Sequence, residues 1–291
     1  MKRYLLLLLF IIFIKPAQAQ IVPDLFFKNW DLSYINPAAL TQAGGLKGNV
    51  QYNVDMMSGV NTAKGGMVQL HTDFGGKHGL GIQLQNQGSG VLAGNGVGAG
   101  YAYRVQLGED QSLSLGGRFN YFKYTINRAE ITHANVSDPV LYGDAYQQSN
   151  ILMTSGLFYQ WKDLQVALTL PEFLPTESTN YYRKNFTAYV GYTFRGPEVS
   201  LRPNFYYEQV AALGGWYEMS LHGAYREVLM LELAHTSEMA FRVKGGVKHR
   251  SFDIGYGFDS GSPILSERQH KMGHRLYLAY SFGEILQRDK E

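Results

Sequence analysis

The sequence predicts an all-β protein: a 14-stranded antiparallel transmembrane β-barrel with a short N-terminal plug segment. Three observations predict this fold. Apolar and polar residues alternate in segment after segment, aromatic residues end the apolar stripes, and short and long connections follow one another. In the last segment, Leu276, Leu278 and Tyr280 fall on one side of an extended strand, whereas Arg275 and Tyr277 fall on the other. In a membrane barrel, the first side faces lipid and the second faces the lumen.

The chain begins with the features of a cleavable secretory signal. Lys2 and Arg3 precede an apolar run, and Ala-Gln-Ala at 17–19 supplies the small residues of a cleavage site. The run is shorter than the about 20 residues that a membrane-spanning helix needs. We therefore expect 1–19 to be a signal peptide and the mature chain to begin at Gln20. Cleavage removes three basic residues and leaves 23 against 24 acidic ones, so nothing in the charge favours nucleic acid as a partner.

Fourteen alternating segments follow a non-repeating stretch, and each is consistent with a tilted strand that crosses a bilayer in about 9–11 residues. They lie near 46–55, 65–74, 78–86, 96–107, 111–124, 150–161, 164–170, 185–195, 198–208, 216–226, 228–236, 240–249, 251–259 and 272–282. We expect 20–45 to be a plug or lead-in segment, 46–283 to form the barrel and 284–291 to be a periplasmic tail. An even number of strands places both ends of the barrel on the same side.

The connections support this count. Outer-membrane barrels have short turns on the periplasmic side and longer loops outside, and every second connection here is short. The short ones are 75–77, 108–110, 162–163, 196–197 and the junctions at 226–227 and 250. The intervening ones are mostly long, namely 56–64, 87–95, 125–149, 171–184, 209–215 and 260–271. The exception is 237–239, a short turn where we expect an outer loop.

One face of the segment 96–107 consists of small residues. Gly96, Gly98 and Gly100 recur with a period of two, which does not match the spacing of a dinucleotide-binding fingerprint. These glycines belong to the inward face of a strand. Their missing side chains leave room in the lumen, where a plug would fit.

The other inward faces carry charges of both signs, as Arg202, Glu208, Arg242 and Lys244 illustrate. Two interpretations are open: a salt-bridged lumen that keeps a filled barrel rigid, and a conduit for a charged substrate. We favour the first, because charges that cannot face lipid must face inward whatever the function is.

Four elements, taken in order, resemble the PorP/SprF family of type IX secretion outer-membrane proteins. They are Asn-Pro-Ala at 36–38, Asp-Pro at 138–139, Leu-Arg-Pro at 201–203, and the carboxy-terminal hairpin over 252–259 and 273–282. The resemblance spans essentially the whole mature chain. It implies a fatty-acid-transporter-like barrel in the outer membrane of a Gram-negative bacterium. It also implies a non-enzymatic component of the type IX protein secretion system that supports export or surface attachment of cargo, such as adhesin or gliding-type proteins.

The implied partners are membrane lipid, other type IX secretion components and a secreted cargo protein, and no cofactor is implied. Asn36, Pro37 and Ala38 are candidates for a plug or partner segment, although a Pro that holds Asn36 extended also suits a simple turn. The central loop offers further candidate contacts, because a loop of this length usually has a role. Its candidates are Asp138, Pro139, Tyr142 and Tyr146. The short turns and even strand count place both termini in the periplasm.

Two other classes stay open. A channel for the uptake of small hydrophobic compounds can have fourteen strands and an Asn-Pro-Ala segment before the first one. An enzyme is the third class, but His235 and Ser237 lack a third orienting group, and the histidines show no metal-ligand spacing. The absence of Cys excludes disulfides and thiolate sites. We therefore predict no catalytic, metal-binding or cofactor-binding residues.

Overall fold

The computed structural model describes residues 26–57, 60–89, 92–126, 147–171, 184–210, 214–237, 240–260 and 271–282. Within these ranges, no helix has the length and hydropathy needed to cross a membrane. The two helices are short 3-10 helices, η1 (Leu32–Tyr34) and η2 (Pro37–Gln42), and both precede the first strand.

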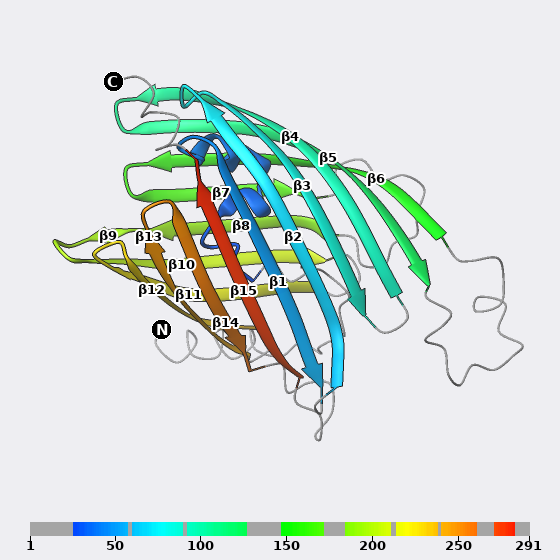
Figure 1. Ribbon diagram of the computed structural model, residues 1–291. Coiled ribbons are helices and arrows are strands. Elements are labelled where there is room, and N and C mark those ends of the chain that lie inside the picture. Colours follow the sequence, from blue (N-terminus) through cyan, green and yellow to red (C-terminus); the bar gives the residue numbers. More distant parts are fainter. Residues whose placement is uncertain are drawn as a thin grey trace, which may run out of the picture.

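The strands form one closed antiparallel barrel (Figure 1). They are β1 (Lys47–Met57), β2 (Val60–Phe74), β3 (His78–Ser89), β4 (Leu92–Gly108), β5 (Gln111–Ile126), β6 (Gln147–Trp161), β7 (Leu164–Leu170), β8 (Lys184–Tyr192), β9 (Phe194–Arg195), β10 (Val199–Val210), β11 (Gly214–Tyr225), β12 (Leu229–Thr236), β13 (Phe241–His249), β14 (Phe252–Asp259) and β15 (Lys271–Ser281). Each strand pairs with its neighbours along the chain, and β15 pairs with β1 to close the sheet.

The labels β8 and β9 denote two parts of one strand, because both pair with β10 in the same register. The interruption lies where β10 contains Pro203, which has no N–H to donate to the ladder. The barrel therefore has fourteen strands in the described part of the chain, as the sequence predicted. The start of β1 and the end of β15 lie together, since Phe282 N donates to Leu46 O over 2.7 Å.

The distribution of exposed and buried residues is the reverse of that in a soluble protein. Leu231 and Leu233 on β12 are 53% and 51% exposed, whereas Glu232 between them is fully buried. On β15, Leu276 is 57% exposed and Tyr277 is 3% exposed. An apolar outer surface around a polar interior is the arrangement of a barrel that faces lipid outside.

Three predicted outer loops are too long. The sequence predicted long connections at 56–64, 87–95 and 209–215. However, β1 ends at Met57 and β2 begins at Val60, β3 ends at Ser89 and β4 begins at Leu92, and β10 ends at Val210 and β11 begins at Gly214. The apolar alternation ends earlier than the strands, which continue with polar outer residues. Asn86 donates to Asn95 across β3 and β4 over 2.7 Å. The ladder of main-chain hydrogen bonds does not require an apolar face. The apolar alternation therefore marks the part of each strand that faces lipid and underestimates the length of the strand.

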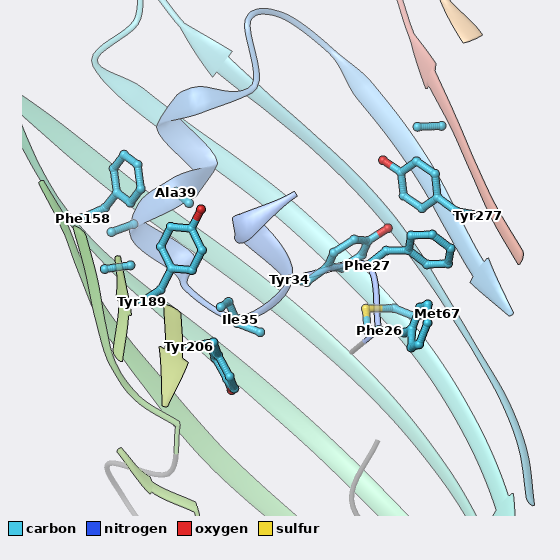
Figure 2. Close-up of a cluster of buried hydrophobic side chains, with 13 residues drawn as sticks. Phe26, Phe27, Tyr34, Ile35, Ala39, Met67, Phe158, Tyr189, Tyr206 and Tyr277 are labelled. Carbon is cyan, nitrogen blue, oxygen red and sulfur yellow. The ribbon is translucent and has the colours of Figure 1, made fainter. Parts of the chain in front are cut away.

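The N-terminal segment, which we define as Phe26–Gly45, lies inside the barrel with η1 and η2 (Figure 1). Its apolar side chains meet inward-facing aromatic residues of the wall. Figure 2 shows this cluster, in which Phe27 lies beside the wall residue Tyr277 and Ala39 lies beside the wall residue Phe158. The hydrophobic core of this protein is thus the filled lumen.

Candidate functional site

One side of the lumen holds a cluster of buried charges, which we call the ion cluster. It comprises Glu218 on β11, Glu232 on β12, Arg242 and Lys244 on β13, and Asp259 on β14. Strand register creates two of its pairs, since Glu232 lies opposite Lys244 and Arg242 lies opposite Asp259. Their N–O distances are 2.7 and 2.9 Å, and Arg242 also bonds Glu218 over 2.7 Å.

Three consecutive residues of the N-terminal segment bind to this cluster. Lys28 Nζ lies 2.9 Å from Glu218 Oε1, and Trp30 Nε1 donates to Glu232 Oε2 over 2.9 Å. Asn29 Nδ2 donates to Glu232 Oε1 over 2.8 Å and lies within 3.2 Å of Glu218 Oε1. The cluster alone carries three negative and two positive formal charges. Lys28 makes the sum zero, which matters because an uncompensated buried charge is strongly unfavourable.

Three inward arginines bind main-chain carbonyls of the same segment. Arg202 Nη2 on β10 donates to Asn29 O over 2.6 Å. Arg118 on β5 donates to Tyr34 O over 3.1 Å and to Ser33 O, and Arg104 on β4 donates to Thr41 O. The guanidinium group has several donors and a permanent charge, so it suits carbonyls that are buried with no water to bind them. Main-chain contacts of this kind do not depend on the sequence of the segment.

Asp31 joins the segment to the beginning of the wall. Its Oδ2 lies 3.3 Å from Lys47 Nζ and 3.6 Å from His71 Nε2, and Oδ1 accepts from Ser33 N over 3.0 Å. Burial alone would raise the pKa of Asp31. The charges of Lys47 and His71, together with the hydrogen bonds from Ser33, outweigh burial and hold the pKa below its ordinary value. Asp31 is therefore a carboxylate at neutral pH.

The predicted candidates Asn36, Pro37 and Ala38 are buried and in contact with the wall. Asn36 caps η2, because its Oδ1 accepts from Ala38 N over 2.8 Å. Its Nδ2 donates to Leu157 O and Leu168 O, on the facing strands β6 and β7, over 2.9 and 3.0 Å. The motif is more than a turn, since it connects the segment to two strands of the barrel.

Inward glycines make this approach possible, and we call them the glycine wall. They are Gly79 and Gly81 on β3, Gly100 on β4, Gly116 on β5 and Gly156 on β6. A Cβ at Gly156 would lie 2.1 Å from Asn36 Oδ1, and one at Gly116 would lie 2.5 Å from Ala38 N. Side chains at these positions would exclude η2.

The predicted glycine run on β4 serves two purposes. A Cβ at Gly100 would meet Leu40 of the segment at 3.1 Å, as the prediction of room for a plug requires. At Gly96 and Gly98, in contrast, a Cβ would meet Phe122 and Asn120 at 2.4 Å. These two glycines accommodate inward side chains of β5, so the prediction holds for Gly100 alone.

The remaining predicted residues do not join the site. Asp138, Pro139, Tyr142 and Tyr146 lie outside the described residues. The His235 ring packs on Phe241 at 5.0 Å, and Ser237 Oγ accepts from Tyr217 N over 3.2 Å. Among the described residues, no three His, Asp or Glu side chains are grouped as metal ligands.

A cavity of about 130 Å³ remains between the segment and the wall, lined by residues that include Asp31, Lys47, His71, Phe158 and Arg202. Ligand pockets for small organic molecules usually measure about 300–1,000 Å³. The cavity lies below this range, and its lining includes charged side chains.

Sequence reasoning missed the parts that Lys28, Trp30, Arg104 and Arg118 play in this site. Phe26-Phe27-Lys28-Asn29-Trp30 does hold a signal, because three aromatic residues within five positions indicate a buried segment. The identity of its carboxylate partners, about 190 positions away, could not be read from spacing.

The model of the family described as type IX secretion system membrane protein PorP/SprF matches residues 17–280. The chain belongs to this family. The match includes the N-terminal segment and every strand of the barrel except the last residue of β15. No curated protein matches the chain.

Solved structures show the same fold at low sequence identity. The Pseudomonas putida toluene transporter TodX has a TM-score of 0.56 at 9% identity, with 87% of this chain and 94% of that one covered. The monoaromatic hydrocarbon channel CymD has a TM-score of 0.54 at 12% identity, with coverage of 92% and 95%. A FadL homologue from Pseudomonas aeruginosa has a TM-score of 0.51 at 8% identity, with coverage of 86% and 93%.

Proposed function

We propose that this PorP/SprF protein is a non-enzymatic outer-membrane component of type IX secretion that supports export or surface attachment of cognate cargo. Family membership over 17–280 supports the secretion role. The structure contributes one observation that carries the proposal further: the lumen is filled by the chain's own N-terminal segment. A barrel filled in this way acts through the surfaces that it presents to other proteins and does not act as an open pore.

The contacts of the segment support a closed resting state. Lys28, Asn36 and Leu40 are each buried, and they contact different parts of the wall. A solute crossing the barrel would have to displace all of these contacts at once. We infer that the resting protein conducts poorly.

The second candidate function is uptake of small hydrophobic compounds, which the names of the structural neighbours favour. The interior of this barrel supports it less well. The ion cluster and Arg118, Arg202 and Asp31 line the lumen, and the cavity of about 130 Å³ is polar and small. A path for hydrophobic compounds needs an apolar lining, and the apolar residues of the wall are here covered by the N-terminal segment.

We propose that the short turns, the start of β1 and the end of β15 face the periplasm, because outer-membrane barrels place their short turns there. Other secretion components would then contact the turns, and cargo would contact the long outer loops. The candidates Asp138, Pro139, Tyr142 and Tyr146 belong to the longest of these loops and remain our proposal for cargo contact.

A deletion strain tests the proposed function. We expect loss of one or a few proteins from the cell surface and culture medium, measured by comparative proteomics, with normal uptake of hydrophobic compounds. The wild-type gene supplied on a plasmid should restore export. Purified protein should show little conductance in planar bilayers. Normal export together with a growth defect on hydrophobic substrates would contradict the secretion role and favour the channel.

A further inference from the structure

The barrel wall is complete without the N-terminal segment. Every strand pairs with a neighbour on each side, and β1 and β15 pair along their whole length from Lys47–Ser281 to Met57–Lys271. The segment contributes 3-10 turns and no strand. It therefore occupies the lumen in the way that a ligand occupies a binding site.

The wall keeps most of its charge pairing without the segment as well. Lys244 remains paired with Glu232, and Arg242 remains paired with Glu218 and Asp259. The segment adds the positive charge of Lys28, the amide of Asn29 and the indole N–H of Trp30. These groups bind carboxylate oxygens that can accept further hydrogen bonds. Each carboxylate oxygen has two lone pairs, so Glu218 and Glu232 can accept from the wall and from the segment together.

The contacts divide into a general part and a selective part. Arg104, Arg118 and Arg202 bind main-chain carbonyls, which any polypeptide offers. Glu218 and Glu232 select a basic residue, an amide and an aromatic N–H in succession. Lys28 Nζ also lies 4.7 Å from the Tyr206 ring centre and 5.2 Å from the Trp216 ring centre, a geometry that favours a cation.

We propose that the lumen is a peptide-binding site. Residues 26–42 are its resident ligand, and a segment of a partner polypeptide displaces them when that partner binds. The incoming segment carries a basic residue two positions before an aromatic one, so that it meets Glu218 and Glu232 as Lys28 and Trp30 do. The assignment of that partner as secretion cargo rests on the proposed function, whereas peptide binding itself does not.

The resident segment has an advantage because it is tethered, and a short flexible tether gives an effective concentration in the millimolar range. The test must therefore remove the tether. Gly44 is exposed and has a φ of 66°, and a Cβ added there would have no heavy atom within 4 Å, so the position has open space around it. A protease recognition sequence inserted there turns the resident segment into a separate peptide after cleavage.

The experiment uses the full protein in lipid nanodiscs and a fluorescent peptide of residues 26–43, with binding measured by fluorescence anisotropy. We expect binding to the cleaved protein and at least tenfold less to the uncleaved one. Arg118→Ala and Glu232→Gln in the wall should each weaken binding about tenfold or more, and a peptide with Lys28→Glu should not compete. Leu233→Ala, which faces outward beside Glu232, is the matched control and should leave binding unchanged.

Two results would overturn the proposal. The first is a cleaved barrel that loses its resistance to unfolding in detergent when the segment leaves, and whose resistance added peptide does not restore. The segment would then be part of the structural core and not a ligand. The second is the absence of peptide binding in a cleaved Lys28→Glu protein, whose resident segment is held less tightly. Peptide binding with normal export in the deletion strain would contradict the proposed function and leave the binding site in place.

Discussion

The two sides of the lumen hold the same segment by different physical means. The glycine wall of β3–β6 binds η2 and its cap by close approach. It contacts the main chain at Ala38 and Leu40 and the side chains of Asn36 and Leu40, and a larger side chain on the wall would prevent these contacts. The ion cluster of β11–β14 binds Lys28, Asn29 and Trp30 through charges and hydrogen bonds. Shape therefore fixes the segment on one side, and charge complementarity fixes it on the other.

This difference shows which contacts determine the position of the segment and which determine the identity of its residues. A buried ion pair contributes little net stability, because desolvation offsets the attraction, but removal of one partner is costly. The ion cluster thus discriminates strongly against a wrong residue at position 28. The glycine wall discriminates by shape, because its glycines leave room for Asn36, Ala38 and Leu40 in close contact.

Charge reversal at position 28 should have the largest effect. Lys28→Glu would leave four acidic and two basic groups together in a buried place, and removal of one partner of a buried pair already costs about 3–5 kcal/mol. The chain has no Cys, so Ala39→Cys, buried at 3%, is a unique reporter. We expect a bulky maleimide to label Ala39→Cys at least tenfold faster with Lys28→Glu. Lys28→Arg should label slowly, and equal labelling of all three proteins would mean that the cluster does not hold the segment.

A side chain in the glycine wall should have the next largest effect. Gly116→Val would place its Cβ 2.5 Å from Ala38 N, and overpacking of this kind costs about 1–3 kcal/mol. Gly117→Val is the matched control, because a Cβ at this neighbouring position would make only ordinary contacts, with the end of Met153 at 3.6 Å and with Thr154 O at 4.0 Å. We expect faster labelling of Ala39→Cys for Gly116→Val alone, with a normal barrel in both by far-UV circular dichroism. Slow labelling in both variants would contradict the role of the glycine wall.

The fold was predictable because lipid imposes the same alternation on every strand. Leu276 and Tyr277 differ in exposure as their positions in the pattern require. The strand ends were less predictable, since Asn86 and Asn95 continue the ladder outside the apolar belt. In the site, the Asn-Pro-Ala motif was visible in the sequence. Its docking on Gly156 was not, because the two lie 120 positions apart and an inward glycine has several possible causes.

Loss of the Asn36 side chain should have an intermediate effect. Asn36→Ala removes the cap of η2 and the hydrogen bonds to Leu157 O and Leu168 O, and loss of a cap alone costs about 0.5–2 kcal/mol. We expect labelling of Ala39→Cys to rise between twofold and tenfold. Asn36→Asp is an informative second variant, because it keeps the cap and loses the amide donor. If both variants label at the original rate, the motif acts only as a turn.

The smallest effect separates two glycines of the same run on β4. At Gly98, the group nearest to an added Cβ is Asn120 Oδ1, the end of a side chain that can rotate, although it also bonds Thr154 through Nδ2 over 3.1 Å. At Gly100, the added Cβ would press on Leu40 at 3.1 Å and on Gly117 O at 3.3 Å. We expect Gly98→Ala to cost less than about 1 kcal/mol and to leave labelling of Ala39→Cys unchanged, because the strain is relieved within the wall. Gly100→Ala should raise labelling measurably, since its strain passes through Leu40 to η2. Equal labelling in the two variants would contradict this distinction. It would mean that Gly98 and Gly100 do not differ in whether they make room for the wall or for the segment.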